Sequence, residues 1–110
     1  MNQSNPSPRI FNKLVRDRIP EIIASRGETA MTHVAESQEY YARLCDKLLE
    51  EVGEFLEQKN IDEELADVLE VIYAICEFKN IDREALEVLR QKKAAERGGF
   101  TKRIVLELTR

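Results

Sequence analysis

The sequence of 110 residues contains no tryptophan, two cysteines and one histidine, and aromatic residues make up only 6% of it. This small number of aromatic rings leaves little surface on which nucleic-acid bases could stack. We therefore expect no nucleic-acid partner. His33 has no cysteine or second histidine placed to complete a zinc site with it. A Ser/His/Asp arrangement and a glycine-rich phosphate loop are also missing, which argues against two common mechanisms of hydrolysis and phosphate binding.

Long apolar runs are missing as well. No stretch approaches the length of a membrane span, and the N-terminus lacks the apolar segment of a signal peptide. Cys45 and Cys76 both fall on apolar helix faces, which favours buried reduced thiols, with a short disulfide between them as the alternative. We therefore expect a cytoplasmic protein with no membrane partner.

Charge is present in quantity and is unevenly distributed. Residues 1–35 carry five basic and three acidic side chains, residues 36–70 carry three and twelve, and residues 71–110 carry nine and six. An acidic centre between basic flanks suits a metal site whose ligand brings negative charge of its own. A helical bundle with one solvated acidic face would show the same distribution.

The pattern of apolar residues predicts a mainly α-helical fold, and the length suits one domain. Residues 1–10 are polar and read as a flexible tail, and residues 11–110 form the domain. We expect a first helix from Asp17, as its N-cap, to about Arg26, with Gly27 as its stop. The other predicted elements are an antiparallel helical hairpin within 36–78, a helix over 82–97 that ends at Gly98-Gly99, and a small two-stranded ribbon that pairs 29–34 with residues near 104–108. The sequence Lys-Asn-Ile-Asp occurs twice, at 59–62 and 79–82, and we expect its aspartate, Asp62 or Asp82, to be the N-cap of the following helix.

Two short acidic motifs stand inside the predicted hairpin, Glu51-Val-Gly-Glu54 and Glu64-Leu-Ala-Asp67. Within each motif the two acids are three residues apart, so they share one helix face. At about 100° per residue, both pairs lie at the edge of their helix's apolar face and on matching sides. Because a short connection makes the helices antiparallel, the four carboxylates should converge near the turn.

Four acids beside a buried seam repel one another unless a cation compensates them. An oxygen-only ligand set favours a hard ion, so the predicted metal is Mg²⁺, with Mn²⁺ as the substitute. The metal ligands would be Glu51, Glu54, Glu64 and Asp67. The alternative is that these acids simply form the solvated edge of two amphipathic helices.

Basic residues flank the acidic centre on both sides. Lys13 and Arg16 precede the first predicted helix, and Lys92, Lys93 and Arg97 occupy the last turns of the helix over 82–97. Each group could bind phosphate, but a basic helix start is common on surfaces, and cations at a helix end suit the helix dipole. One hairpin and one further helix leave the apolar seam incompletely covered. A homodimer with a four-helix-bundle core, or a higher oligomer, would bury it.

The paired acidic motifs resemble the E-x-x-E and E-x-x-D signature of the all-α nucleoside-triphosphate pyrophosphohydrolase superfamily, which includes MazG and phosphoribosyl-ATP pyrophosphohydrolase. Two further stretches, Asn12-Lys-Leu-Val-Arg-Asp-Arg-Ile-Pro-Glu21 and Arg97-Gly-Gly-Phe100, are similar to its small, single-domain MazG-like house-cleaning branch. The resemblance covers about residues 11–108. Nine residues separate the two acidic motifs, fewer than in MazG itself, so nucleobase selectivity does not carry over.

The resemblance implies a helical oligomer that holds Mg²⁺ on its four acids and cleaves a nucleotide between its α and β phosphates. It also implies that Lys92, Lys93 and Arg97 hold phosphates. Hydrolysis of this kind needs charge neutralisation and an aligned water, so one carboxylate must accept a proton, and Glu50 and Glu54 are the candidates. The alternatives are phosphoribosyl-ATP as the substrate, or a helical dimerisation module without catalysis.

Overall fold

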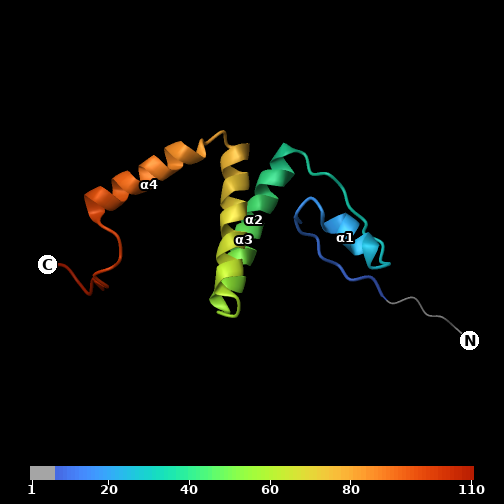
Figure 1. The fold of residues 1–110 in the computed structure, drawn as a ribbon, viewed down its shortest axis with the longest axis horizontal. Coiled ribbons are helices and arrows are strands. Elements are labelled where there is room, and N and C mark those ends of the chain that lie inside the picture. The colour runs from blue at the N-terminus through green and yellow to red at the C-terminus, as the bar shows by residue number, and fades with distance from the viewer. Residues whose placement is uncertain (1–6) are drawn as a thin grey trace, which may run out of the picture. The chain divides into compact units, whose positions relative to one another are not determined.

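The computed structural model describes residues 7–110, and over that range it contains four helices and no strand (Figure 1). A mainly α-helical fold is therefore confirmed. The chain divides into two compact units, Met1–Ile72 and Tyr73–Arg110. The helices are α1 (Ile19–Ser25), α2 (Ser37–Leu56), α3 (Ile61–Phe78) and α4 (Arg83–Arg97). The predicted tail over 1–10 lies outside the described residues up to position 6, and residues 7–10 are exposed and irregular.

The first unit is organised by α2 and by the part of α3 up to Ile72, which run antiparallel beside each other (Figure 1). Only residues 57–60 join them, so the chain must reverse sharply. Gln58 takes a left-handed conformation with φ of 60°, and its backbone N–H and side-chain amide both donate to the carbonyl of Phe55 at 3.0 Å. This tight turn fixes the end of α2 next to the start of α3.

Acidic residues stand at the starts of both hairpin helices. Glu36 caps α2, and its carboxylate accepts from the backbone N–H groups of Gln38 and Glu39 at 2.9 and 2.8 Å. Asp62 is not an N-cap, because α3 already begins at Ile61, and Asp62 lies in its first turn. There it is one of three acids that suit the positive end of the helix dipole.

The two copies of the Lys-Asn-Ile-Asp sequence, at 59–62 and 79–82, therefore start their helices in different ways. In the second copy Asn80 is left-handed with φ of 56°, and Ile81 donates its N–H to the carbonyl of Cys76 at 2.8 Å, which ends α3. Asp82 then caps α4 as predicted, accepting from the N–H of Glu84 at 3.2 Å. In the first copy Gln58 has already completed the turn, so the helix starts before the aspartate.

The first helix is shorter than predicted. α1 begins at Ile19, its N-cap is Arg18 without a side-chain cap bond, and Asp17 is not the cap. The N–H of Ile19 instead donates to the carbonyl of Arg16 at 3.0 Å, so a turn leads into the helix. Pro20 stands in the first turn, where its missing N–H removes no helical bond. The predicted stop is confirmed, since Gly27 has φ of 82°.

The buried core is small. Leu44 and Val71 are 2% and 7% exposed in the first unit, and Cys76 is 4% exposed in the second. Burial of Cys45 was predicted and is wrong, because this thiol is exposed on α2. Both cysteines are free thiols, so the alternative of a disulfide between them is not realised.

The segments predicted to form a ribbon contain no helix or strand. Met31 and Val34 are 96% and 97% exposed, and Ile104 and Leu106 are also largely exposed. The period-2 alternation of apolar residues is present in both segments, but an isolated strand needs a paired edge to be stable. The structure contains no strand within residues 7–110, so the predicted ribbon is not found there.

Within the described part of the chain, no helix is long and apolar enough to cross a bilayer. This agrees with the absence of long apolar runs in the sequence.

Replacing Leu44 by alanine should destabilise the protein by about 2–5 kcal/mol, since it leaves a cavity in a core with few other buried side chains. Urea denaturation followed by circular dichroism measures the loss. Gln38→Ala, at an exposed position of the same helix, should stay within about 0.5 kcal/mol of the wild type. Equal losses in the two variants would contradict this assignment of the core.

Candidate metal centre

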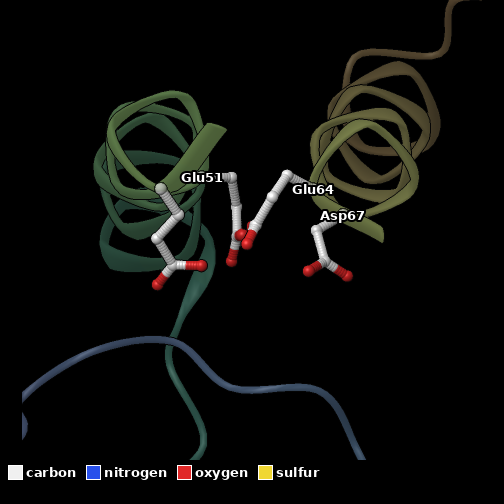
Figure 2. Close-up of side chains that lie close together, drawn as sticks. Glu51, Glu64 and Asp67 are labelled. Carbon is white, nitrogen blue, oxygen red and sulfur yellow. The ribbon is translucent and has the colours of Figure 1, made fainter. Parts of the chain in front are cut away.

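The four acids of the paired motifs come together at the turn end of the hairpin. Glu51 and Glu54 from α2 and Glu64 and Asp67 from α3 each offer a carboxylate oxygen, and these oxygens all lie within 4.8 Å of one another. Figure 2 shows Glu51, Glu64 and Asp67 pointing toward a common space from two neighbouring helices. The predicted convergence is thus confirmed as geometry. It follows from i, i+3 spacing on two antiparallel helices joined by a short turn.

Glu51 is the most deeply buried member of this cluster, with 7% of the residue exposed. It follows Leu44 by seven residues, so both lie on the same buried face of α2. One carboxylate oxygen, Oε1, lies 3.5 Å from the Nζ of Lys47, one turn earlier. The other, Oε2, is buried without a hydrogen-bond partner, as is the Oε2 of Glu64.

Unpaired buried oxygens on charged groups are unfavourable. Leaving a buried polar group unsatisfied costs about 1–3 kcal/mol, and more when the group is charged. Among the described residues these two carboxylate oxygens, one from each helix, are the buried side-chain atoms without a partner. Both belong to the same four-acid cluster. The four carboxylates therefore fit a cation that would be coordinated by both of these unpartnered oxygens.

Charge repulsion within the cluster leads to the same conclusion. Two carboxylates 4.8 Å apart repel by about 1 kcal/mol in water and by about 3 kcal/mol at an effective dielectric constant of 20. Burial raises the pKa of Glu51, and the neighbouring charge of Glu54 raises it further against the opposing effect of Lys47. Loss of solvation likewise raises the pKa of Glu64, with contributions from Glu54 and Asp67. The cluster thus resists full ionisation in the absence of additional positive charge.

Glu50 lies next to the cluster in sequence but outside it in space. Its carboxylate is 2.9 Å from the Nζ of Lys13 and 3.4 Å from that of Lys47, and its side chain is 26% exposed. Partial burial opposes its ionisation, but the hydrogen bond from Lys13 and the charge of Lys47 outweigh this and lower its pKa. Glu50 is therefore a half-buried carboxylate with two lysine partners.

The basic residues predicted to bind phosphate fall into two groups. Lys13 and Arg16 precede α1 in the first unit, where Lys13 pairs with Glu50 and Arg16 pairs with Asp67 of the cluster at 2.7 Å. The hydrogen bond with Glu50 raises the pKa of Lys13, although desolvation opposes the shift. The other three, Lys92, Lys93 and Arg97, are exposed on α4 in the second unit, and their phosphate-binding role stays a prediction.

Sequence reasoning missed two partners of the acids. Lys47 stands three residues before Glu50 and four before Glu51, a spacing that signals ion pairs on a helix and could have identified it. The pairing of Arg16 with Asp67 joins residues 51 positions apart, and no local sequence pattern predicts such a contact.

Replacing Glu51 by glutamine should stabilise the metal-free protein at neutral pH. Since the pKa of Glu51 is raised above its usual 4.5 in the folded state, its contribution to stability is fully present below about pH 4.5 and is lost as the pH rises through the folded value. Glutamine is neutral at every pH, so this loss disappears. We expect a gain of about 1 kcal/mol at pH 7.5 in EDTA and a smaller difference at pH 4.5.

Thermal and urea denaturation at the two pH values measure this difference. Glu57→Gln is the matched control, because its side chain is 57% exposed one residue after the same helix, and it should change stability by less than about 0.5 kcal/mol. A Glu51→Gln variant less stable than the wild type at pH 7.5 would show that this carboxylate is not held under unfavourable electrostatics.

Comparison with known proteins gives little further information. No protein-family model matches the chain, and no solved structure matches it. An uncharacterized protein from Mycolicibacterium smegmatis (strain ATCC 700084 / mc(2)155) is 50% identical over 42 residues, which cover 38% of this chain and 43% of that protein. The chain therefore matches less than half the length of this relative, and the similarity establishes neither a family nor an activity.

Proposed function

We propose that this protein is a Mg²⁺-dependent nucleotide pyrophosphohydrolase that converts a nucleoside triphosphate, including noncanonical ones, to the monophosphate and pyrophosphate. The observation that carries the proposal is the four-acid cluster with its two unpartnered buried oxygens. The resemblance of residues 11–108 to the MazG-like pyrophosphohydrolases adds support, because it includes the basic stretches outside the hairpin as well as the acidic motifs. A cytoplasmic location is part of the proposal.

The chemistry of the donors selects the metal. Carboxylate oxygens without nitrogen or sulfur ligands favour hard divalent ions. Mg²⁺ keeps several waters and is commonly bound by a few carboxylates together with substrate phosphates, and Mn²⁺ accepts similar ligands. Glu51, Glu54, Glu64 and Asp67 would hold the ion, and the ion would supply charge neutralisation and activation of water.

The protein's own residues then have distinct tasks. Water attacks phosphorus, the bond between the α and β phosphates breaks, and pyrophosphate leaves with the bridging oxygen. A carboxylate must accept a proton from the water, and Glu54 is better suited than Glu50. Glu50 is already paired with Lys13 and Lys47, which lower its pKa, whereas Glu54 is half-buried inside the cluster. Lys13 and Arg16 adjoin the cluster and carry the charge needed to bind phosphates.

Glu51→Gln and Asp67→Asn should each reduce pyrophosphate release at least about a hundredfold, because each removes a charged ligand from the ion. The assay measures pyrophosphate from a panel of canonical and noncanonical triphosphates with Mg²⁺, and with EDTA as the metal-free control. Glu63→Gln, next to Glu64 but exposed, is the matched control and should keep full activity. Full activity in both cluster variants would exclude the mechanism.

The same assay distinguishes the alternatives. Turnover of phosphoribosyl-ATP in preference to every triphosphate would assign the protein to the phosphoribosyl-ATP pyrophosphohydrolases. A helical dimerisation module without catalysis would release no pyrophosphate and would show no saturable Mg²⁺ binding that depends on the four acids. The exposed apolar residues of the hairpin are the observation that favours such a module.

We further propose that the protein forms a homodimer, or a higher homo-oligomer, with a four-helix-bundle core. The hairpin leaves four leucines 45–73% exposed, namely Leu49, Leu56, Leu65 and Leu69. At about 100° per residue, Leu49 and Leu56 lie about 140–160° round α2 from Glu51 and Glu54. A partner on that face would bury them and leave the acidic cluster accessible.

The double variant Leu49→Glu/Leu56→Glu should shift the protein toward the monomer, since charges in an apolar interface are unfavourable. Light scattering after size-exclusion chromatography measures the mass. Gln38→Glu adds a charge at an exposed polar position of α2 and should leave the oligomer unchanged. A wild type that is monomeric at micromolar concentration would contradict the dimer.

A further inference from the structure

Residues 12–16 form a basic segment that is tied to both hairpin helices. The segment begins at Asn12, which has a left-handed φ of 45° and whose carbonyl accepts a hydrogen bond from Arg43 on α2. Lys13 then pairs with Glu50 on α2 at 2.9 Å, and Arg16 pairs with Asp67 on α3 at 2.7 Å. In Figure 2 the N-terminal part of the chain, drawn in blue, passes beneath the carboxylates. We call residues 12–16 the basic strap.

The contact of Arg16 is with a member of the acidic cluster itself. Its Nη2 donates to the Oδ1 of Asp67, one of the four acids whose oxygens lie within 4.8 Å of one another. A fixed positive charge at this point reduces repulsion among the acids but opposes the approach of a second cation. The guanidinium of Arg16 therefore supplies part of the positive charge that a divalent ion would otherwise bring to the cluster.

The strap cations are also free to move to another anion. The side chains of Arg16 and Lys13 are 55% and 40% exposed, so neither is locked by packing. A guanidinium binds carboxylate and phosphate with the same planar, forked geometry. An exposed ion pair contributes only modestly to stability, so exchanging one anion for another costs little.

From these contacts we infer that Arg16 competes with the divalent ion for Asp67 and moves to the polyphosphate of the substrate when both bind. This rests on the proposed function and specifies how its two ligands cooperate. In the free protein the strap keeps the affinity for the metal low. The phosphate chain takes Arg16, Asp67 becomes available to the ion, and metal and polyphosphate strengthen each other's binding by the same factor.

Arg16→Gln tests this inference without an activity assay. In isothermal titration with Mg²⁺ alone, the variant should bind the ion about three- to tenfold more tightly than the wild type. With Mg²⁺ saturating, it should bind inorganic tripolyphosphate, which carries the phosphate chain without a base, at least about tenfold more weakly. Arg18→Gln removes the same charge two residues away, where Arg18 pairs with Glu21, and should stay within about twofold of wild type in both titrations.

The opposite signs of the two changes make the test specific. If Arg16 only held Asp67 in place for the metal, Arg16→Gln would weaken Mg²⁺ binding, and that result overturns the inference, as does an unchanged affinity. Arg16→Lys keeps the positive charge but loses the forked guanidinium. Its affinity for Mg²⁺ should lie between those of Arg16→Gln and the wild type. If the wild type binds no Mg²⁺ in a carboxylate-dependent way, the metal site itself fails and the strap exchange fails with it.

Discussion

Repulsion among four carboxylates at the edge of a buried seam is the constraint on which the rest of this structure depends. Glu51 lies on the same helix face as Leu44, so it cannot move into water without unpacking the hairpin. Its neighbours in the cluster cannot separate, because a connection of four residues holds α2 and α3 together. The fold thus keeps negative charge concentrated at one place, at a cost in stability that a bound cation would remove.

The remaining local interactions hold that arrangement in position. Glu36 starts α2 and the left-handed Gln58 closes its end, which sets the register of Glu51 and Glu54 against α3. Lys47 and Arg16 supply limited positive charge at the rim, enough to pair Glu50 and Asp67 but not to satisfy the inner oxygens of Glu51 and Glu64. A site that is partly neutralised but still carries excess negative charge is suited to bind a metal ion together with an anion.

The sequence predicted the parts of this arrangement that depend on helical periodicity. The convergence of the four acids follows from spacing along a helix, and the cap at Asp82 follows from the preference of helix starts for aspartate; both are found. The errors occur where two short-range signals compete or where distant residues meet. Asp17 and Asp62 had the chemistry of caps, but Arg18 and the turn at Gln58 set those helix starts. The contact between Arg16 and Asp67 could not be predicted, because it depends on the path of an irregular segment.

The most direct test of the central claim is to locate a divalent ion in crystals of the protein grown with Mn²⁺, whose anomalous scattering identifies it unambiguously. The account predicts an anomalous peak between α2 and α3, within coordination distance of carboxylate oxygens from Glu51, Glu64 and at least one of Glu54 and Asp67. Four ordered carboxylates with no peak among them at millimolar Mn²⁺, or a peak bound only elsewhere on the chain, would contradict it.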